Sequence, residues 1–365
     1  MEGKGKQIMA SENEKMETVC DYFPSDLITE IFQRISLETA PSTGRLSREW
    51  AKSLWSKSLA NPRILFMSPD ARNKTSHLWF HSVLQNKPPE QWNKNQVTIP
   101  RLACPLQYIS SQTVRGSICC YNKTGKSAIL NPTRGVYKAL PKVTNLWPRD
   151  ETHYSLGFDL ESHVFKVLCL ISGCTELRIL NLLDENMYWR TIDRKHTPIS
   201  PVDPRGICID GKMYFGADNF SIVSCFDLTK EELWTIKVPI GVKRYDNLVK
   251  VNGKLALIVK GSQPGARRIW TLEAAGTWSK LRYEIPPLPQ FSLKCTYECV
   301  GTIGTDKFVF TPCSPLQEPL HVMYYEPKIL APLKISINCT VNPPPPNVRT
   351  VLDFVEIPNF SSTKD

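Results

Sequence analysis

Residues 206–216 have the sequence GICIDGKMYFG, and residues 248–259 have the sequence LVKVNGKLALIV. In both stretches, two short apolar runs flank a pair of turn-forming residues, Asp210-Gly211 in the first and Asn252-Gly253 in the second. Asp-Gly and Asn-Gly between such runs are the strongest short-range pattern for a β-hairpin, because these residues tolerate the positive φ of a tight turn. We therefore expect hairpins at both places and an all-β structure around them.

The same design recurs along most of the chain. Five segments each contain an apolar run, a polar residue that ends it, a turn, and then usually an aromatic residue. The polar residues are Asn131, Asn181, Asp227, Glu273 and Glu326, which lie 50, 46, 46 and 53 residues apart. Aromatic residues follow the first four, at Tyr137, Trp189, Trp234 and Trp278. A β-rich repeat of this length is typical of propeller blades, each a four-stranded sheet, and we expect the aromatic residues to pack between blades.

Five repeats leave the number of blades open. The sequence VLDFVEI at residues 351–357 could supply a closing strand from the end of the chain. The sequence VNPPPPN at residues 341–347 cannot join a central strand, because proline has no N–H to donate, so we expect an extended connector there.

A different pattern precedes the repeats. In PSDLITEIFQRI (residues 24–35) the apolar residues Leu27, Ile28, Ile31, Phe32 and Ile35 form one stripe of a helix. Pro24 and Ser25 are typical of a helix start. A module of about 45 residues cannot fully cover such a stripe, which favours a protein partner.

Composition excludes several classes of protein. Apolar residues make up 41% of the 365 residues and charged residues 22%, which is ordinary for globular proteins and excludes a wholly disordered chain. No apolar run approaches the roughly 18 residues of a membrane-spanning helix, and the polar N-terminus lacks the pattern of a secretory signal. We therefore expect a protein of the nucleus or cytoplasm with mostly reduced cysteines.

The net charge of +10 is uneven. Residues 1–60 carry −1 and residues 61–365 carry +11. The densest basic pairs are Lys243-Arg244 and Arg267-Arg268, and no run of five Lys or Arg occurs. A basic body can attract nucleic acid or acidic partners. Because no nucleic-acid-binding motif accompanies the charge, we interpret it as a solvated surface, with nucleic-acid binding as a minor alternative.

No pattern of metal-binding or catalytic residues is present. The 12 cysteines lack the paired spacing of zinc sites, and we expect Cys119, Cys169, Cys208 and Cys225 to pack in the core. The six histidines are scattered, and we interpret His77 and His81 as two unrelated surface residues. Hydrolase and phosphate-loop motifs do not occur. We therefore predict no catalytic, cofactor-binding or metal-binding residues and a protein that is not an enzyme.

Residues 23–50 resemble an F-box. The positions that match its pattern are Phe23, Pro24, Asp26, Leu27, Glu30, Ile31, Arg34, Ile35, Leu46, Ser47, Arg48 and Trp50. The repeats that follow, among them AILNPTRGVYKALP and IVSCFDLTKEELWTI, resemble the type 3 F-box-associated domain of plant F-box proteins, whose fold is related to kelch-type propellers. The fold class expected from both is an α+β multidomain chain, with a small helical F-box followed by an all-β, kelch-like propeller.

This resemblance implies a domain order and a function. We expect a disordered leader at residues 1–20, the F-box at 21–66, a linker at 67–100 and the propeller at 101–360. Such proteins are substrate-recognition adaptors of SCF-type ubiquitin ligases. The F-box docks on a Skp-type adaptor, which links to cullin and RING subunits, and the propeller binds a protein substrate. The adaptor-facing positions carry over to Pro24, Leu27, Ile31, Leu46 and Trp50.

One segment departs from the F-box pattern. Between Ser36 and Arg45 the sequence is SLETAPSTGR, with Ser36 where proline is usual. Proline costs about 3 kcal/mol inside a helix and glycine about 1 kcal/mol relative to alanine, so Pro41 and Gly44 shorten or fray the second helix. The alternative function is therefore a protein-binding module that no longer joins a ligase.

Overall fold

The computed structural model describes the segment that carries the repeats. It covers residues 62–355 apart from gaps at 70–76, 95–96, 104–107, 123–124, 134, 145–151, 172–176, 184–186, 193–200, 218, 275, 289–295, 314–319, 330 and 339–347. Asn61–Ile357 form one compact unit. The expected leader, the expected F-box up to residue 61 and the polyproline connector at 341–347 lie outside the described residues.

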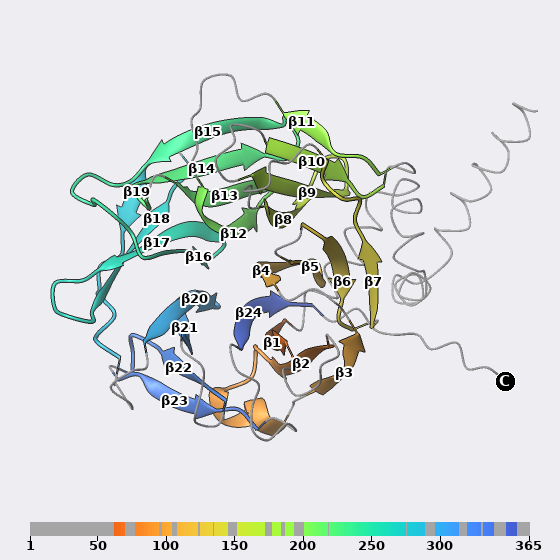
Figure 1. Cartoon of the computed structure of the whole chain (residues 1–365). Coiled ribbons are helices and arrows are strands. Elements are labelled where there is room, and N and C mark those ends of the chain that lie inside the picture. The colour runs from red at the N-terminus through yellow and green to blue at the C-terminus, as the bar shows by residue number, and fades with distance from the viewer. Residues whose placement is uncertain are drawn as a thin grey trace, which may run out of the picture. The chain divides into compact units, whose positions relative to one another are not determined.

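Six four-stranded antiparallel sheets, arranged around an axis, make up the described part of the chain (Figure 1). We number these blades 1 to 6 and give each from its inner to its outer strand. Blade 1 holds β24 (Arg349–Phe354), β1 (Arg63–Pro69), β2 (His77–Leu84) and β3 (Val97–Ala103). Blade 2 holds β4 (Tyr108–Val114), β5 (Ser117–Tyr121), β6 (Ser127–Asn131) and β7 (Val136–Ala139). Blade 3 holds β8 (Thr152–Asp159), β9 (Val164–Ile171), β10 (Leu177–Asn181) and β11 (Arg190–Ile192).

The remaining blades repeat this order. Blade 4 holds β12 (Pro201–Ile209), β13 (Lys212–Ala217), β14 (Ile222–Asp227) and β15 (Glu232–Lys237). Blade 5 holds β16 (Asn247–Val251), β17 (Lys254–Lys260), β18 (Arg267–Leu272) and β19 (Trp278–Lys280). Blade 6 holds β20 (Tyr297–Ile303), β21 (Lys307–Pro312), β22 (His321–Tyr325) and β23 (Leu333–Ser336). The expected all-β propeller is confirmed.

Blade 1 corrects the expected domain boundaries. The prediction of a linker at residues 67–100 and a propeller starting at 101 is wrong, because β1, β2, a 3₁₀ helix η1 (Pro89–Lys94) and most of β3 fill this segment. Their buried side chains include Trp79, Phe80 and Trp92. The polar composition of residues 86–96 is typical of a linker. The strand before them, β2, is buried on both faces and therefore shows no alternation of apolar and polar residues.

The closing strand is confirmed. β24 pairs antiparallel with β1, and Arg63 lies opposite Phe354. The Gln85 side chain spans this junction, since its Nε2 donates to Asp353 Oδ1 and its Oε1 accepts the Asp353 N–H, both at 2.8 Å. Strands from both ends of the propeller sequence thus complete one blade.

The polar residues that mark the repeat lie where the third strand of each blade ends. Asn131, Asn181 and Asp227 are the last residues of β6, β10 and β14, while Glu273 and Glu326 follow β18 and β22 directly. Blade 1 has the same pattern: Gln85 follows β2, lies 46 residues before Asn131, and is followed seven residues later by Trp92. The sequence therefore contains a sixth repeat in addition to the five expected.

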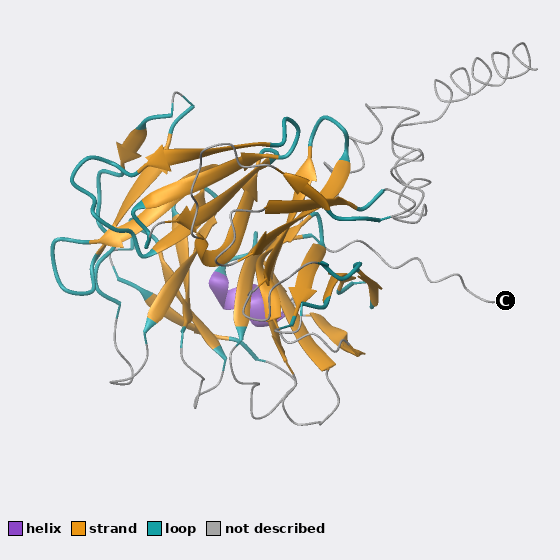
Figure 2. Cartoon of the chain, turned by 45° about the horizontal axis from the view of Figure 1, so that its top comes forward, coloured by secondary structure: helices purple, strands orange, loops and turns teal. Residues whose placement is uncertain are grey.

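The expected hairpins form as the sequence predicts. Asp210 and Gly211 have φ of 48° and 74°, and Asn252 and Gly253 have φ of 50° and 77°, as the mirror-image tight turn requires. Turns of this kind join the first and second strands of blades 2, 4 and 5. We call the end of the blades with the first-to-second and third-to-fourth connections the turn end. The opposite end, with the second-to-third and blade-to-blade connections, is the loop end. Figure 2 shows the strands of the blades in orange and the described connections between them in teal.

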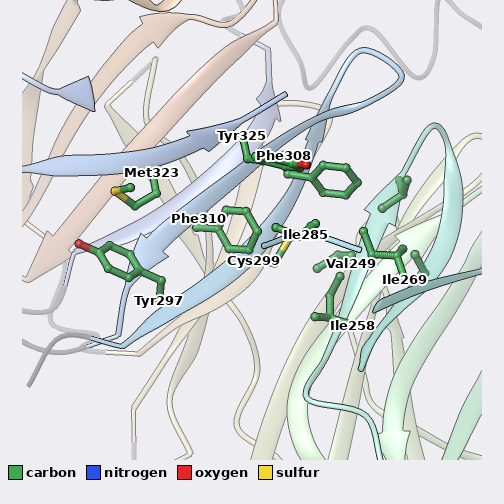
Figure 3. Close-up of a cluster of buried hydrophobic side chains, with 12 residues drawn as sticks. Val249, Ile258, Ile269, Ile285, Tyr297, Cys299, Phe308, Phe310, Met323 and Tyr325 are labelled. Atoms are coloured by element: carbon green, nitrogen blue, oxygen red, sulfur yellow. The ribbon is translucent and has the colours of Figure 1, made fainter. Parts of the chain in front are cut away.

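The cores lie between neighbouring blades. Figure 3 shows one of them, in which Val249, Ile258 and Ile269 of blade 5 lie in one cluster with buried residues of blade 6, such as Phe308 and Phe310. Each sheet buries a face against the neighbouring blade. A single blade on its own would leave its apolar faces exposed to water.

The repeat aromatics divide into two groups. Trp189 and Trp278 join blades as expected, since their indole N–H groups donate to Pro141 O and Lys237 O, each at 2.8 Å, in the preceding blade. For Tyr137 and Trp234 the packing prediction is wrong, because these side chains are 46% and 36% exposed.

Candidate functional site

The predicted adaptor-facing residues, Pro24, Leu27, Ile31, Leu46 and Trp50, lie outside the described part of the chain. Their role therefore stays a prediction. The surfaces that can be built from described residues belong to the propeller.

Polar side chains near the axis join blades to one another. Gln112 of β4 is paired with the backbone of Cys208 in β12: its Nε2 donates to Cys208 O at 3.0 Å, and its Oε1 accepts the Cys208 N–H. The Arg115 guanidinium lies 3.8 Å from the ring centroid of Phe158, and burial lowers the pKa of Arg115 to about 10. These contacts hold the inner strands, and with them the turns, in fixed relative positions.

The cysteines are core residues where the sequence predicts them. Cys119, Cys169 and Cys225 are fully buried, and Cys208 is partly exposed. Burial raises the pKa of the Cys169 and Cys225 thiols to about 12, so both are protonated at neutral pH. Within the described residues, no group of three His, Cys, Asp or Glu could hold a metal ion, and no helix is long and apolar enough to cross a membrane.

His81 corrects the interpretation of a surface histidine. It lies on β2, is fully buried, and stacks on Trp79 with ring centroids 5.8 Å apart. Burial first, and the nearby positive charge of Arg63 second, lower the pKa of His81 to about 4. The side chain is therefore neutral at neutral pH.

This histidine predicts a pH dependence of stability. Between pH 6.5 and 4 the unfolded chain protonates His81 and the folded chain does not, so stability falls as the pH falls. We expect His81 to account for a loss of about 1–3 kcal/mol in the free energy of unfolding over this range. Denaturant unfolding at several pH values should show a flatter profile for His81→Gln than for the wild type. Identical profiles would contradict the prediction.

Exposed apolar side chains gather at the turn end. Of the seven large hydrophobic residues that are exposed in the described structure, Leu160, Leu183, Tyr188 and Ile329 lie in connections at the turn end, Tyr137 and Trp234 lie on the outer strands β7 and β15, and Ile240 lies at the loop end. Five of these seven come from the adjacent blades 2, 3 and 4, and we call them the apolar rim: Tyr137, Leu160, Leu183, Tyr188 and Trp234. Apolar groups concentrated at one end of a rigid scaffold are typical of a surface that binds a protein.

A charged cluster supports this rim at the junction of blades 3 and 4. Lys166 Nζ lies 3.0 Å from Asp159 Oδ2 and 3.2 Å from Glu231 Oε1, and it also donates to Leu228 O at 2.5 Å. Arg190 binds both oxygens of Glu231, at 2.9 and 2.7 Å. Since Glu231 and Leu228 belong to blade 4 and the other residues to blade 3, the cluster fixes the two blades together.

The electrostatics of this cluster favour the charged forms. Burial alone would raise the pKa of Asp159, but hydrogen bonds from Thr229, Ser162 and Lys166 outweigh it and hold the pKa well below its usual value. Burial would also raise the pKa of Glu231, and hydrogen bonds from Arg190 and Lys166 lower it instead. Both carboxylates therefore stabilise the fold above their ordinary pKa values, and this stabilisation is lost progressively as the pH falls from those values to the lowered folded values.

Comparison with known proteins gives consistent matches. A family model described as "F-box associated beta propeller domain" matches residues 63–342. The chain is 29% identical to F-box protein DOR of Arabidopsis thaliana over 358 residues, covering 88% of each chain. It is 25% identical to the F-box/kelch-repeat protein At3g04660 of the same plant, covering 92% of this chain and 93% of the relative.

These matches extend beyond the propeller. The 92% of this chain covered by At3g04660 is more than the 304 residues that follow position 61. That similarity therefore includes part of the N-terminal segment.

Proposed function

Because the chain belongs to the family defined by the F-box associated beta-propeller domain, we propose that it is the substrate-recognition adaptor of an SCF-type ubiquitin ligase. The observation that carries this proposal is the coincidence of two matches. The family model spans the blades from Arg63 onward, and relatives named F-box proteins are similar over nearly the whole chain, including residues before 62.

In this function the protein makes and breaks no bonds itself. The F-box would dock on a Skp-type adaptor and, through it, on cullin and RING subunits. The propeller would hold a protein substrate on a rigid surface, for which the apolar rim is the candidate at the turn end. Holding both in one assembly raises the effective concentration of substrate lysines near the conjugating enzyme, in the nucleus or cytoplasm.

The adaptor-facing stripe gives the first test. In the full-length chain, Leu27→Ala/Ile31→Ala should weaken binding to a purified Skp-type adaptor about 100-fold, because buried apolar anchors dominate such interfaces. A matched control, Leu183→Ala/Tyr188→Ala, removes two exposed side chains of the propeller and should leave the affinity unchanged. Titration calorimetry measures both. Equal affinity of all three proteins would contradict the assigned residues.

A second candidate function rests on Pro41 and Gly44, which disfavour the second F-box helix. A protein without a working F-box would be a binding module outside any ligase. In that case the wild type should not bind the adaptor at micromolar concentrations, and Pro41→Ala/Gly44→Ala should restore binding. Binding by the wild type would exclude this alternative.

A further inference from the structure

The fold brings the two densest basic pairs of the sequence to the same place. β15 ends at Lys237 and leads into a connection that carries Lys243-Arg244, at the loop end of blades 4 and 5. β17 ends at the loop end of blade 5, and β18 begins there with Arg267-Arg268. The pairs are 23 residues apart in sequence but share one end of one propeller segment.

This end of blades 4 and 5 carries most of their positive charge. Among the described residues from 206 to 288, the strand ends supply Lys237, Lys260, Arg267, Arg268 and Lys280. The connections supply Lys243, Arg244 and Arg282. We call these eight residues the basic edge. Two described carboxylates, Asp246 and Glu284, accompany them, whereas the turn end of the same blades has four Lys and five Asp or Glu.

Backbone contacts hold the basic edge in place. Trp278 Nε1 donates to Lys237 O at 2.8 Å and so joins the outer strands of the two blades. Arg268 Nε donates to Lys260 O at 2.9 Å. The two carboxylates lie beside the arginines, with Asp246 3.9 Å from Arg267 and Glu284 3.8 Å from Arg268. The cations still outnumber the carboxylates by six.

An apolar side chain stands within this charged surface. Ile240 is fully exposed, three residues before Lys243. Its connection has a defined shape: the Val242 N–H donates to Pro239 O at 3.0 Å, and buried Tyr245 donates from its hydroxyl to Ile222 O at 3.0 Å. One exposed isoleucine is ordinary by itself, but here it offers an apolar contact between clustered cations.

We propose that the basic edge binds a carboxylate-rich segment of a protein partner, with Ile240 in contact with an apolar side chain of that segment. Complementary charge steers such a segment to the surface and sets its specificity. Single-stranded nucleic acid fits less well, because its sites usually provide aromatic rings for stacking, whereas the exposed apolar group here is aliphatic. The inference goes beyond the proposed function, because the basic edge lies at the loop end, whereas the apolar rim proposed to hold a substrate lies at the turn end.

The experiment uses the full-length chain and two labelled peptides of about 15 residues. One alternates Asp and Glu around a central leucine, and the other has Asn and Gln in their place. We expect the acidic peptide to bind and the neutral peptide not to bind. Lys243→Glu/Arg244→Glu should weaken binding about tenfold or more. Reversal of one exposed charge has a modest effect, and this variant reverses two charges of the basic edge. A rise in salt from about 50 to 150 mM should also weaken it.

The control variant Lys138→Glu/Lys230→Glu changes the net charge equally but lies outside the basic edge, and it should retain the wild-type affinity. Ile240→Asp should weaken binding of the acidic peptide, while Ile329→Asp, at the turn end of blade 6, should not. Equal binding of both peptides, or equal loss in edge and control variants, would overturn the proposal. So would tighter binding of a single-stranded DNA oligonucleotide than of the acidic peptide.

Adaptor binding is measured on the same samples. Loss of adaptor binding with retained peptide binding would contradict the ligase function and leave the basic edge standing. Retained adaptor binding with loss of peptide binding would contradict only the proposed role of the basic edge.

Discussion

Replacement of Trp92 by alanine is expected to lower the free energy of unfolding by about 3–5 kcal/mol. Trp92 lies in η1, is fully buried, and donates from Nε1 to Lys87 O at 2.9 Å. Its ring meets Tyr324 of blade 6 edge-on, with centroids 6.1 Å apart. Truncation leaves a large cavity between blades 1 and 6, because the surrounding sheets can collapse only partly.

The matched control is Trp234→Ala. This tryptophan is partly exposed on the outer strand of blade 4, where Lys212 Nζ lies 5.8 Å from its ring centroid. We expect its loss to cost less than about 1 kcal/mol. Denaturant unfolding of the full-length variants gives both values. If Trp92→Ala proved as mild as Trp234→Ala, residues 85–94 would behave as the linker that composition suggests.

Replacement of Lys166 by methionine is expected to cost about 3–5 kcal/mol, because it leaves the carboxylates of Asp159 and Glu231 without their shared buried cation. The side chains of Lys166 and Asp159 are only 8% and 2% exposed. The loss should be greatest near neutral pH and smaller in acid, where protonation of the carboxylates removes the uncompensated charge.

Two comparisons make this prediction specific. Lys250→Met breaks the ion pair between Lys250 and Asp353, in which each side chain is 43% exposed. This substitution should lower the free energy of unfolding by less than about 1 kcal/mol. Lys166→Met/Asp159→Asn removes one charge on each side and should be less destabilised than the sum of its single variants. Strict additivity of the two substitutions would mean that Lys166 acts only through packing.

The sequence predicted those parts of the fold that local chemistry determines. Asp210-Gly211 and Asn252-Gly253 form the tight turns because few other residues adopt positive φ easily. Arg115-Gly116, with φ of 48° and 73°, forms the same kind of turn without this pattern. Such a turn is imposed by the strands on either side and cannot be recognised from its own residues.

The closing strand of blade 1 could be predicted from the sequence, but the blade's other three strands, β1 to β3, could not be predicted from local pattern. The sixth repeat was present in Gln85 and Trp92, but the run HLWFHSVL of β2 does not alternate, so periodicity failed there. The surfaces depend on topology even more strongly. The order of the strands in each blade determines that Tyr137 and Trp234 are exposed. The same order brings Lys243 and Arg267 to one edge.

The pairing of β1 with β24 delays the folding of blade 1 during synthesis. The ribosome delivers β1 early, and its partner strand begins at Arg349, about 285 residues later. At about 5–20 residues per second, this delay is roughly 15 to 60 s. Throughout it, the nascent chain presents β1 with a row of unpaired backbone groups that can recruit strands from other chains. The ring can close only after β24 has been synthesised, so a chain that terminated before Arg349 would keep this edge of β1 unpaired.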